Sequence, residues 1–284
     1  VNYRSGLFWY KQGIKRIVLA RELSMNEIIE MRKKLPAECE IEAFVHGSMC
    51  MAYSGRCLLS NFLTGRDANR GACAQPCRYK YYLTEEKRPG EYYQILEDDK
   101  GSYIMNSKDL CMIEYIPQLV SAGISSFKIE GRMKSAFYVA VITKAYREAL
   151  DAYWKDPENY VFNKKWLEDV DKVSHRQYYT GFYFNDPNKQ VYENSSYIRN
   201  YDIVGVVKNY NEETKRATIE QRNKVFEGEE AEVLRPVGDY FKIKLNDMRD
   251  LEGNKLESTP VAQMIYTIQC DEKLEVNDMI IVKK

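Results

Sequence analysis

Apolar residues alternate with polar ones, or recur at helical spacing, through the first half of the chain. The alternating runs predict short buried strands at residues 14–20, 40–46, 102–106 and 124–129. The helical stripes predict helices at residues 3–12, 25–35, 108–122 and 134–153. A capping box, Ser24-Met25-Asn26-Glu27, marks the start of the second helix. Strands that alternate with helices predict an α/β region with a parallel sheet.

These strands fit an open sheet or the second half of an eight-stranded (β/α) barrel whose first half is absent from the chain. Polar residues follow each strand, and they are Arg21 and Glu22; His46 and Gly47; Asn106, Ser107 and Lys108; and Glu130, Gly131 and Arg132. In a parallel α/β architecture such positions lie on one face, which is where active sites form. We therefore expect the functional residues to converge there.

The pattern changes after residue 154. Residues 155–200 combine a short helix with loops and read as a connector, whereas residues 201–284 contain several short strands separated by turns. The latter predict a small β-barrel domain. The expected domains are thus a partial (β/α) barrel at 1–154 with a cysteine-rich insertion at about 47–101, the connector at 155–200, and the β-barrel domain at 201–284.

Composition narrows the class of protein but not its function. The 284 residues include 42 basic and 42 acidic side chains, so any nucleic-acid site has to be a local basic patch. The sequence has no apolar run that could span a bilayer and no signal peptide, which predicts a cytoplasmic protein without a membrane partner. The chain begins at Val1 rather than Met, so we expect a fragment or a trimmed protein.

Five of the seven cysteines fall in one region of the chain, and they are Cys50, Cys57, Cys73, Cys77 and Cys111. Their spacing suits zinc poorly, because zinc sites commonly use tight pairs separated by two residues. An iron–sulfur cluster needs four thiolates and accepts wider spacing. A third possibility is that the thiols are simply buried packing residues. We favour the cluster over zinc and zinc over packing. Cys39 and Cys270 are expected to be packing residues.

Arginines surround these cysteines, with Arg56, Arg66 and Arg70 in the same segment. Guanidinium groups could offset the charge of a thiolate-bound cluster or hold an anionic substrate. The alternative is a solvated loop with local pairing to Asp67. Tyr53 and Tyr79 could stack on bases, or be ordinary half-buried aromatic residues.

Two further groups are candidates for chemistry. His46 could be a general base, a metal ligand or a substrate donor, or it could simply bond to a neighbouring loop. We take His175 as structural. The segment 128–135 joins a strand end to a helix start, where Arg132, Lys134 and the backbone amides favour an anion. Glu130 could act on substrate or pair with Arg132, and Lys108 is a further substrate-binding candidate.

The sequence lacks the common motifs of peptidases and of nucleotide-binding proteins. The sequence lacks G-x-S-x-G, H-E-x-x-H and the P-loop. A conventional serine or zinc peptidase is therefore not indicated.

The stretch from Glu42 to Ser60, E-x-F-x-x-G-S-M-C-x4-G-R-C-x-x-S, resembles the signature of peptidase family U32, the collagenase-like proteases. The blocks NSKDLC (106–111) and FKIEGRMKS (127–135) resemble further parts of that family. The resemblance covers nearly the whole chain. It implies the C-terminal half of a (β/α)8 TIM-like barrel followed by a small all-β barrel domain.

The family's better-understood members imply an RNA-modifying hydroxylase, although the family is named for peptidase activity. Those proteins hydroxylate tRNA wobble uridine or ribosomal RNA, or act in ubiquinone biosynthesis, and bind an iron–sulfur cluster through four cysteines. The arrangement RDANRGACAQPCR is most similar to the tRNA uridine 5-hydroxylation branch, which implies a prephenate-derived, small anionic co-substrate. Relatives use the position of either Cys77 or Cys111, so the resemblance leaves the fourth ligand open.

Together these observations predict tRNA wobble 5-hydroxyuridine formation, supported by a [4Fe–4S] cluster. The expected roles are four of the five cysteines as cluster ligands; His46 and Glu130 as proton-handling groups; and Arg56, Arg66, Arg70, Lys108, Arg132 and Lys134 as binding groups for substrate or RNA phosphate. Two alternatives stay open. One is a collagenase-like hydrolase that pairs Cys50 with His46, and the other is an RNA- or protein-binding scaffold with a structural cluster. A protein partner is compatible with each of these functions.

Overall fold

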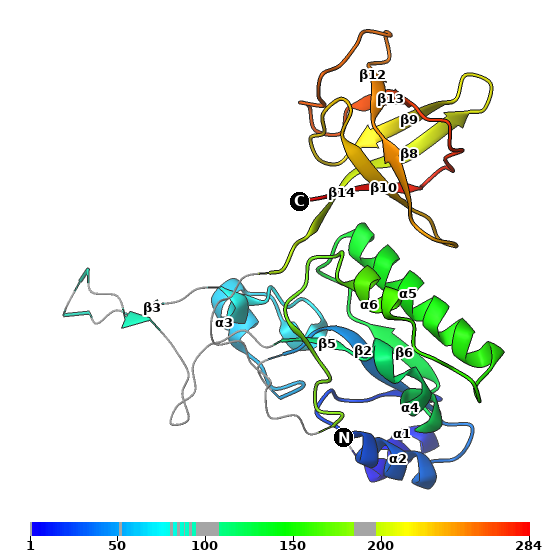
Figure 1. The fold of residues 1–284 in the computed structure, drawn as a ribbon. Helices are drawn as coiled ribbons and strands as arrows, with labels where there is room; N and C mark the ends of the chain where they lie inside the picture. Colours follow the sequence, from blue (N-terminus) through cyan, green and yellow to red (C-terminus); the bar gives the residue numbers. More distant parts are fainter. Residues whose placement is uncertain are drawn as a thin grey trace. The chain divides into compact units, whose positions relative to one another are not determined.

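The computed structural model describes residues 2–50, 53–79, 82–83, 86–87, 89–90, 93–94, 108–184 and 197–284 (Figure 1). The chain forms two compact units. The first contains Val1–Arg132, Ala149–Phe162 and His175–Ile198, and the second contains Met133–Glu148, Asn163–Ser174 and Arg199–Lys284. The strand predicted at 102–106, with Asn106 and Ser107, lies outside the described residues.

The first unit begins with two capped helices. Helix α1 (Tyr3–Lys11) starts after Asn2, whose side chain accepts hydrogen bonds from the amides of the first turn. Helix α2 (Met25–Lys34) starts after Ser24, and the Glu27 carboxylate accepts from the Ser24 amide at 2.8 Å. That bond holds the pKa of Glu27 below its ordinary value. The predicted capping box is therefore confirmed.

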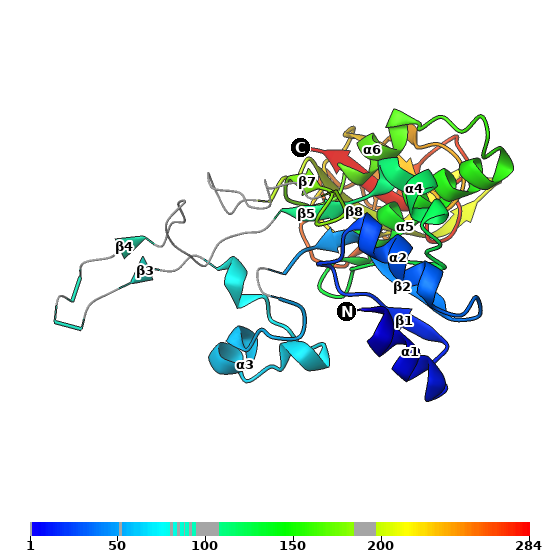
Figure 2. The same ribbon diagram turned by 90° about the horizontal axis from the view of Figure 1, so that it is seen from below.

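Three parallel strands form the centre of the first unit. Strand β1 (Arg16–Val18) pairs with β2 (Glu40–Ser48), placing Ile17 beside Ile41, and β2 pairs with β6 (Ser126–Ile129). Buried and half-buried residues alternate over the first part of β2, as expected for a strand with one face in the core, and its last four residues are all buried. The parallel pairing predicted from the sequence is confirmed, and Figure 2 shows β1 next to β2.

The segment predicted as one helix at 108–122 is instead divided into three elements. Strand β5 (Asp109–Cys111) runs antiparallel to β2, and a 3₁₀ turn (Ile113–Tyr115) leads into helix α4 (Ile116–Ser121). The prediction was wrong because the amides and carbonyls of 109–111 pair with the distal end of β2, a long-range contact that local periodicity does not encode. The sheet is therefore mixed.

The expected connector also contains regular structure. Helix α6 (Lys164–Val170) is followed by strand β7 (Tyr178–Tyr179), which pairs in parallel with β5. Helix α5 (Ala136–Lys155) matches the long predicted helix. The other short elements are α3 (Leu59–Thr64); the 3₁₀ turns Ala68–Arg70 and Pro76–Arg78; and the β3 (Tyr82–Leu83) and β4 (Tyr93–Gln94) pair. Among the helices of the described residues, none is long and apolar enough to cross a membrane.

Residues 201–284, which we call the β-domain, fold as an antiparallel sheet. Its strands are β8 (Tyr201–Asn211), β9 (Arg216–Gln221), β10 (Glu230–Leu234), β11 (Phe241–Lys244), β12 (Asn246–Arg249), β13 (Ile265–Gln269) and β14 (Met279–Lys283). They pair in the order β11-β10-β14-β8-β9-β13-β12. The two end strands, β11 and β12, are joined by Leu245 alone, so the sheet has to curl to bring its ends together. The sequence predicted a small β-barrel, and the structure shows an antiparallel half-barrel.

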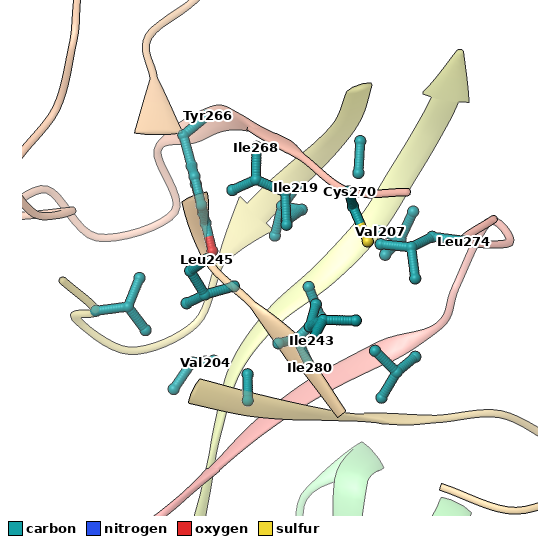
Figure 3. Packing of buried hydrophobic residues seen from close by; sticks show 14 of the residues in the cluster. Val204, Val207, Ile219, Ile243, Leu245, Tyr266, Ile268, Cys270, Leu274 and Ile280 are labelled. Carbon is teal, nitrogen blue, oxygen red and sulfur yellow. The ribbon is translucent and has the colours of Figure 1, made fainter. Parts of the chain in front are cut away.

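The β-domain has its own apolar core. Tyr266 of β13, Ile219 of β9 and Leu245, between β11 and β12, are fully buried and point toward one another (Figure 3). Lys172, which follows α6, belongs to the same unit and pairs with Glu232 of β10 at 2.8 Å. The second unit thus combines an apolar interior with paired charges at its margin.

Candidate functional site

A cleft of about 340 Å³ lies among the segments that follow β1 and β2. Its walls are formed by Arg21, Glu22, Met49, Cys50, Tyr53, Ser54 and Phe182. Cys50 is exposed, and the Tyr53 side chain is 52% exposed. The volume falls within the range of small-molecule sites. Of the polar residues predicted to converge after the strands, Arg21 and Glu22 line this cavity, together with the candidate thiol of Cys50.

Arg21 connects the ends of three strands. Its Nη1 donates to the Ser48 carbonyl at 2.8 Å, its Nη2 donates to Glu130 Oε2 at 2.9 Å, and its guanidinium carbon lies 3.9 Å from the centroid of the Phe44 ring. A fork-shaped cation held on two sides is a rigid element. The sequence placed Arg21 on the active face without giving it a role, because its partner Glu130 is 109 residues away.

Gly47 allows β2 and Glu130 to approach closely. Its φ of +118° is unfavourable for other residues, and a Cβ there would lie 2.7 Å from both Cβ and the carbonyl oxygen of Glu130. The Glu130 amide donates to the His46 carbonyl at 2.9 Å. Glu130 is thus held by backbone and side-chain contacts and pairs with Arg21, rather than with Arg132 as one interpretation of the sequence suggested.

Glu22 is bonded through one oxygen only. Its Oε1 accepts from the Ser54 amide at 2.8 Å, which ties the segment after β1 to the segment after β2. Its Oε2 is shielded from water and has no hydrogen-bond partner among the described residues. A carboxylate with this environment in a cleft wall is a candidate ligand-binding group.

Residues 53–79, which we call the cysteine lobe, fold around a serine hydroxyl. Ser60 of α3 is buried, and its Oγ accepts from the Ala74 amide at 2.9 Å. This contact brings the segment after Cys57 to the segment between Cys73 and Cys77. The Gln75 amide donates to Cys73 Sγ at 3.3 Å. The local fold therefore gathers three cysteines into one small element.

The thiols fit an iron–sulfur cluster by chemistry but are not arranged as a closed metal site. Cys57, Cys73 and Cys77 are half-buried, so they are accessible to a cofactor. Within the described part of the chain, no three His, Cys, Asp or Glu side chains are placed to hold a metal ion. Cys111 differs from the others, because it is buried in β5 directly opposite His46 of β2.

His46 lies inside the sheet rather than in the cleft wall. Strand β2 continues to Ser48, and the His46 side chain is fully buried. Its ring centroid is 5.2 Å from that of Tyr178, which stacks at 4.1 Å on His175. Sequence reasoning took His175 as structural and did not identify this row of rings, whose members come from distant segments.

The predicted cationic residues are distributed over several places. Arg56, Arg66 and Arg70 are exposed on the cysteine lobe, and Lys108 is half-buried directly before β5. Arg132 reaches the lobe, because its guanidinium occupies the space that a Cβ at Gly71 would need. Lys134 donates to the Ser174 carbonyl at 3.2 Å, and α5 begins at Ala136.

Residues 1–193 match peptidase family U32, and residues 199–280 match the peptidase family U32 C-terminal domain. The chain is 41% identical over 280 residues to "tRNA hydroxylation protein P1" of Bacillus subtilis, covering 98% of the chain and 66% of that protein.

Two further relatives differ in their names. The chain is 33% identical to "tRNA hydroxylation protein P" of Escherichia coli, covering 100% of the chain and 70% of that protein. It is 45% identical over 211 residues to an "uncharacterized protease" of Methanocaldococcus jannaschii, covering 71% of the chain and 51% of that protein. The chain thus spans only part of the length of the relatives it matches.

Proposed function

We propose, since this chain belongs to peptidase family U32, that it supports hydroxylation of uridine at the wobble position of tRNA. The names of the Bacillus subtilis and Escherichia coli relatives support an action on tRNA. The observation that carries the proposal is the cleft after β1 and β2, which combines Cys50 with Arg21, Glu22 and Tyr53. A wobble base belongs to a single-stranded loop, so it can leave the stack and enter such a cavity.

The cysteine lobe is suited to contact the RNA. It contains four arginines and one aspartate, although the whole chain is neutral. Leu58 is 69% exposed and Phe62 of α3 is 84% exposed; they lie one helical turn apart, on the face opposite the Ser60 attachment. The lobe thus combines positive charge with the exposed aromatic ring of Phe62, and this combination is usual in surfaces that bind single-stranded nucleic acid. Arg56, Arg66 and Arg70 would contact phosphates there.

Cys50, Cys57, Cys73 and one more cysteine would hold a [4Fe–4S] cluster, which would supply electron transfer when bound. Cys77 is our choice for the fourth ligand. It lies in the 3₁₀ turn next to α3, in the same lobe as Cys57 and Cys73, whereas Cys111 is buried in β5. A prephenate-derived co-substrate would add an anionic group that Arg132, Lys134 or Lys108 could bind.

The chain's own groups have three tasks in this proposal. Arg21 keeps Glu130 oriented and fixes the end of β2 through Ser48. Glu130 and His46 are the groups proposed to take up or release protons, with His46 acting from within the sheet. The strand-helix repeats would form the C-terminal half of a (β/α)8 barrel.

Nucleoside analysis of tRNA tests this function. Deleting the gene should remove 5-hydroxyuridine and its derivatives from the wobble position, and a plasmid copy should restore them. Unchanged 5-hydroxyuridine in the deletion strain would reject the assignment. An RNA-binding scaffold would bind tRNA and leave that nucleoside unaltered.

A hydrolase is the second candidate, because the exposed Cys50 thiol lines the cleft and one relative is named a protease. Incubating the anaerobically purified protein with gelatin or collagen peptides tests it. Cleavage by the wild type that disappears in Cys50→Ser would support a thiol hydrolase. Absence of cleavage by protein that modifies tRNA would exclude it.

A further inference from the structure

Glu22 occupies an unusual position in the cleft wall. The Ser54 amide at 2.8 Å fixes its Oε1, while Oε2 is shielded from water and has no hydrogen-bond partner among the described residues. A carboxylate has about four acceptor positions, of which one is filled here. A buried oxygen without a donor costs free energy, so a ligand in the cleft would be expected to supply one.

The neighbouring cation does not neutralise Glu22. Arg21 directs Nη1 to the Ser48 carbonyl and Nη2 to Glu130, and no described residue forms an ion pair with Glu22. The acceptor position on Oε2 is thus unfilled, and an N–H group reaches it where a ligand displaces the side chains that shield this oxygen. Tyr53 and Phe182 add aromatic walls, on which a planar base could stack.

We infer that the cleft is a uracil-binding site in which the Glu22 carboxylate accepts a hydrogen bond from the N3–H group of the base. This inference rests on the proposed function and names how the site recognises its substrate. Uracil carries a single N–H donor between two carbonyl oxygens on its Watson–Crick edge. Cytosine has a lone pair at N3, which a carboxylate repels. Glu22 is therefore a specificity-determining residue that selects uridine over cytidine.

Because the Ser54 amide fixes the orientation of the Glu22 side chain, a single substitution can exchange the acceptor Oε2 for a donor. In Glu22→Gln, the Ser54 amide would hold the amide oxygen in the place of Oε1, so that the NH₂ group replaces Oε2. That NH₂ group can donate to N3 of cytosine but opposes N3–H of uracil. The variant should therefore reverse the preference, whereas Glu22→Ala should abolish it.

Binding is measured by fluorescence anisotropy with the anaerobically purified protein and labelled anticodon stem-loop RNAs. The RNAs differ only at the wobble position, which carries uridine, cytidine or 3-methyluridine. In 3-methyluridine a methyl group replaces the hydrogen on N3, so this base cannot donate the proposed hydrogen bond to Glu22. The exposed Glu38, which forms no described contact, gives the matched control Glu38→Gln.

Wild type and Glu38→Gln should bind uridine RNA about 10- to 100-fold more tightly than either other RNA. Glu22→Gln should favour cytidine, and Glu22→Ala should bind all three RNAs with similar affinity. Unchanged discrimination in both Glu22 variants, with wild-type thermal unfolding, would overturn the inference. Failure of the wild type to bind any of the RNAs would instead count against the proposed function itself.

Discussion

The cysteine lobe and the β-domain differ in what they bury. In the lobe, the described residues bury little beyond Ser60 and Pro76, and Phe62 remains 84% exposed. The β-domain buries a cluster of apolar residues from most of its strands, including Tyr266 and Ile219. The lobe therefore owes its shape to backbone and hydroxyl contacts, whereas the β-domain is held by its core.

Their charges differ as well. The lobe has four basic side chains and one acidic side chain, while the β-domain has 13 basic and 17 acidic ones. Several β-domain charges are paired, as in Arg216 with Asp247 at 2.6 Å and Arg235 with Asp278 at 2.9 Å. An RNA should therefore be attracted to the lobe rather than to the β-domain. The proposed function thus assigns chemistry and binding to the lobe and stability to the β-domain.

The largest expected effect is on cofactor content. Cys57→Ser and Cys73→Ser should lose the iron–sulfur absorbance and most of the iron of anaerobically purified protein, because three thiolates hold a cluster poorly. Cys270→Ser is the control, since burial in the β-domain raises the pKa of that thiol to about 11. Cys77→Ser should lose iron as Cys57→Ser and Cys73→Ser do, and Cys111→Ser should keep its iron. The reverse result would assign the fourth position to Cys111.

The next effect is on stability alone. Ile219→Ala removes a fully buried side chain from the β-domain core and should lower the free energy of unfolding by about 2–4 kcal/mol. Iron content and RNA affinity should stay unchanged below the unfolding temperature. Denaturant titration combined with iron assay measures both properties. Loss of iron in folded Ile219→Ala would show that the two regions are not separable in function.

The arginines of the lobe should matter for RNA affinity. Replacing Arg56, Arg66 and Arg70 with Gln should weaken tRNA binding about 10- to 100-fold at physiological salt and lower the salt slope of log K by about 2. The matched control replaces three exposed lysines of the β-domain, Lys242, Lys244 and Lys255. Equal losses in the two triple variants, measured by anisotropy across salt concentrations, would contradict the division of roles.

The smallest expected effect is on the pH dependence of stability, which should differ in sign between Glu42 of the first unit and Asp169 of the second. Burial favours neutral Glu42, but bonds from Lys128 and Ser126 outweigh it and lower its pKa from 4.5. Glu42 thus stabilises the fold above pH about 4.5, and Glu42→Gln should cost about 1–2 kcal/mol at pH 7 and less as the pH falls.

Burial instead raises the pKa of Asp169 in α6. Its contribution to stability is present below its unfolded pKa and is lost as the pH rises through the raised folded value. Asp169→Asn should therefore gain stability relative to wild type between pH 4 and pH 7. Denaturant titration of both variants at pH 4 and pH 7 measures these changes. As the pH rises, Glu42→Gln should lose stability relative to wild type and Asp169→Asn should gain it. The same trend in both variants would contradict the opposite pKa shifts of the two carboxylates.

Local patterns in the sequence predicted much of the fold. The capping box at Ser24, the alternation in β2 and the long helix α5 all depend on neighbouring residues, and each is confirmed. The helix predicted from Lys108 failed at its start because Asp109–Cys111 pairs with β2. That pairing depends on residues more than sixty positions away.

The site was predictable in part for the same reason. The position of polar residues after strands correctly indicated where Arg21 and Glu130 would meet, but not that they would pair. The clustering of cysteines predicted the lobe region, yet spacing alone could not separate Cys77 from the buried Cys111. Side-chain pairing between distant segments is set by tertiary structure, which no local motif records.

The most direct test of the central claim is the 5-hydroxyuridine content of tRNA in a deletion strain carrying variant genes. Wild type and Cys270→Ser should restore the nucleoside to equal levels, and Cys57→Ser should not, although all three proteins accumulate to similar amounts. Restoration by Cys57→Ser would contradict a cluster-dependent site in the cysteine lobe, and failure of the wild type to restore it would contradict the assigned reaction.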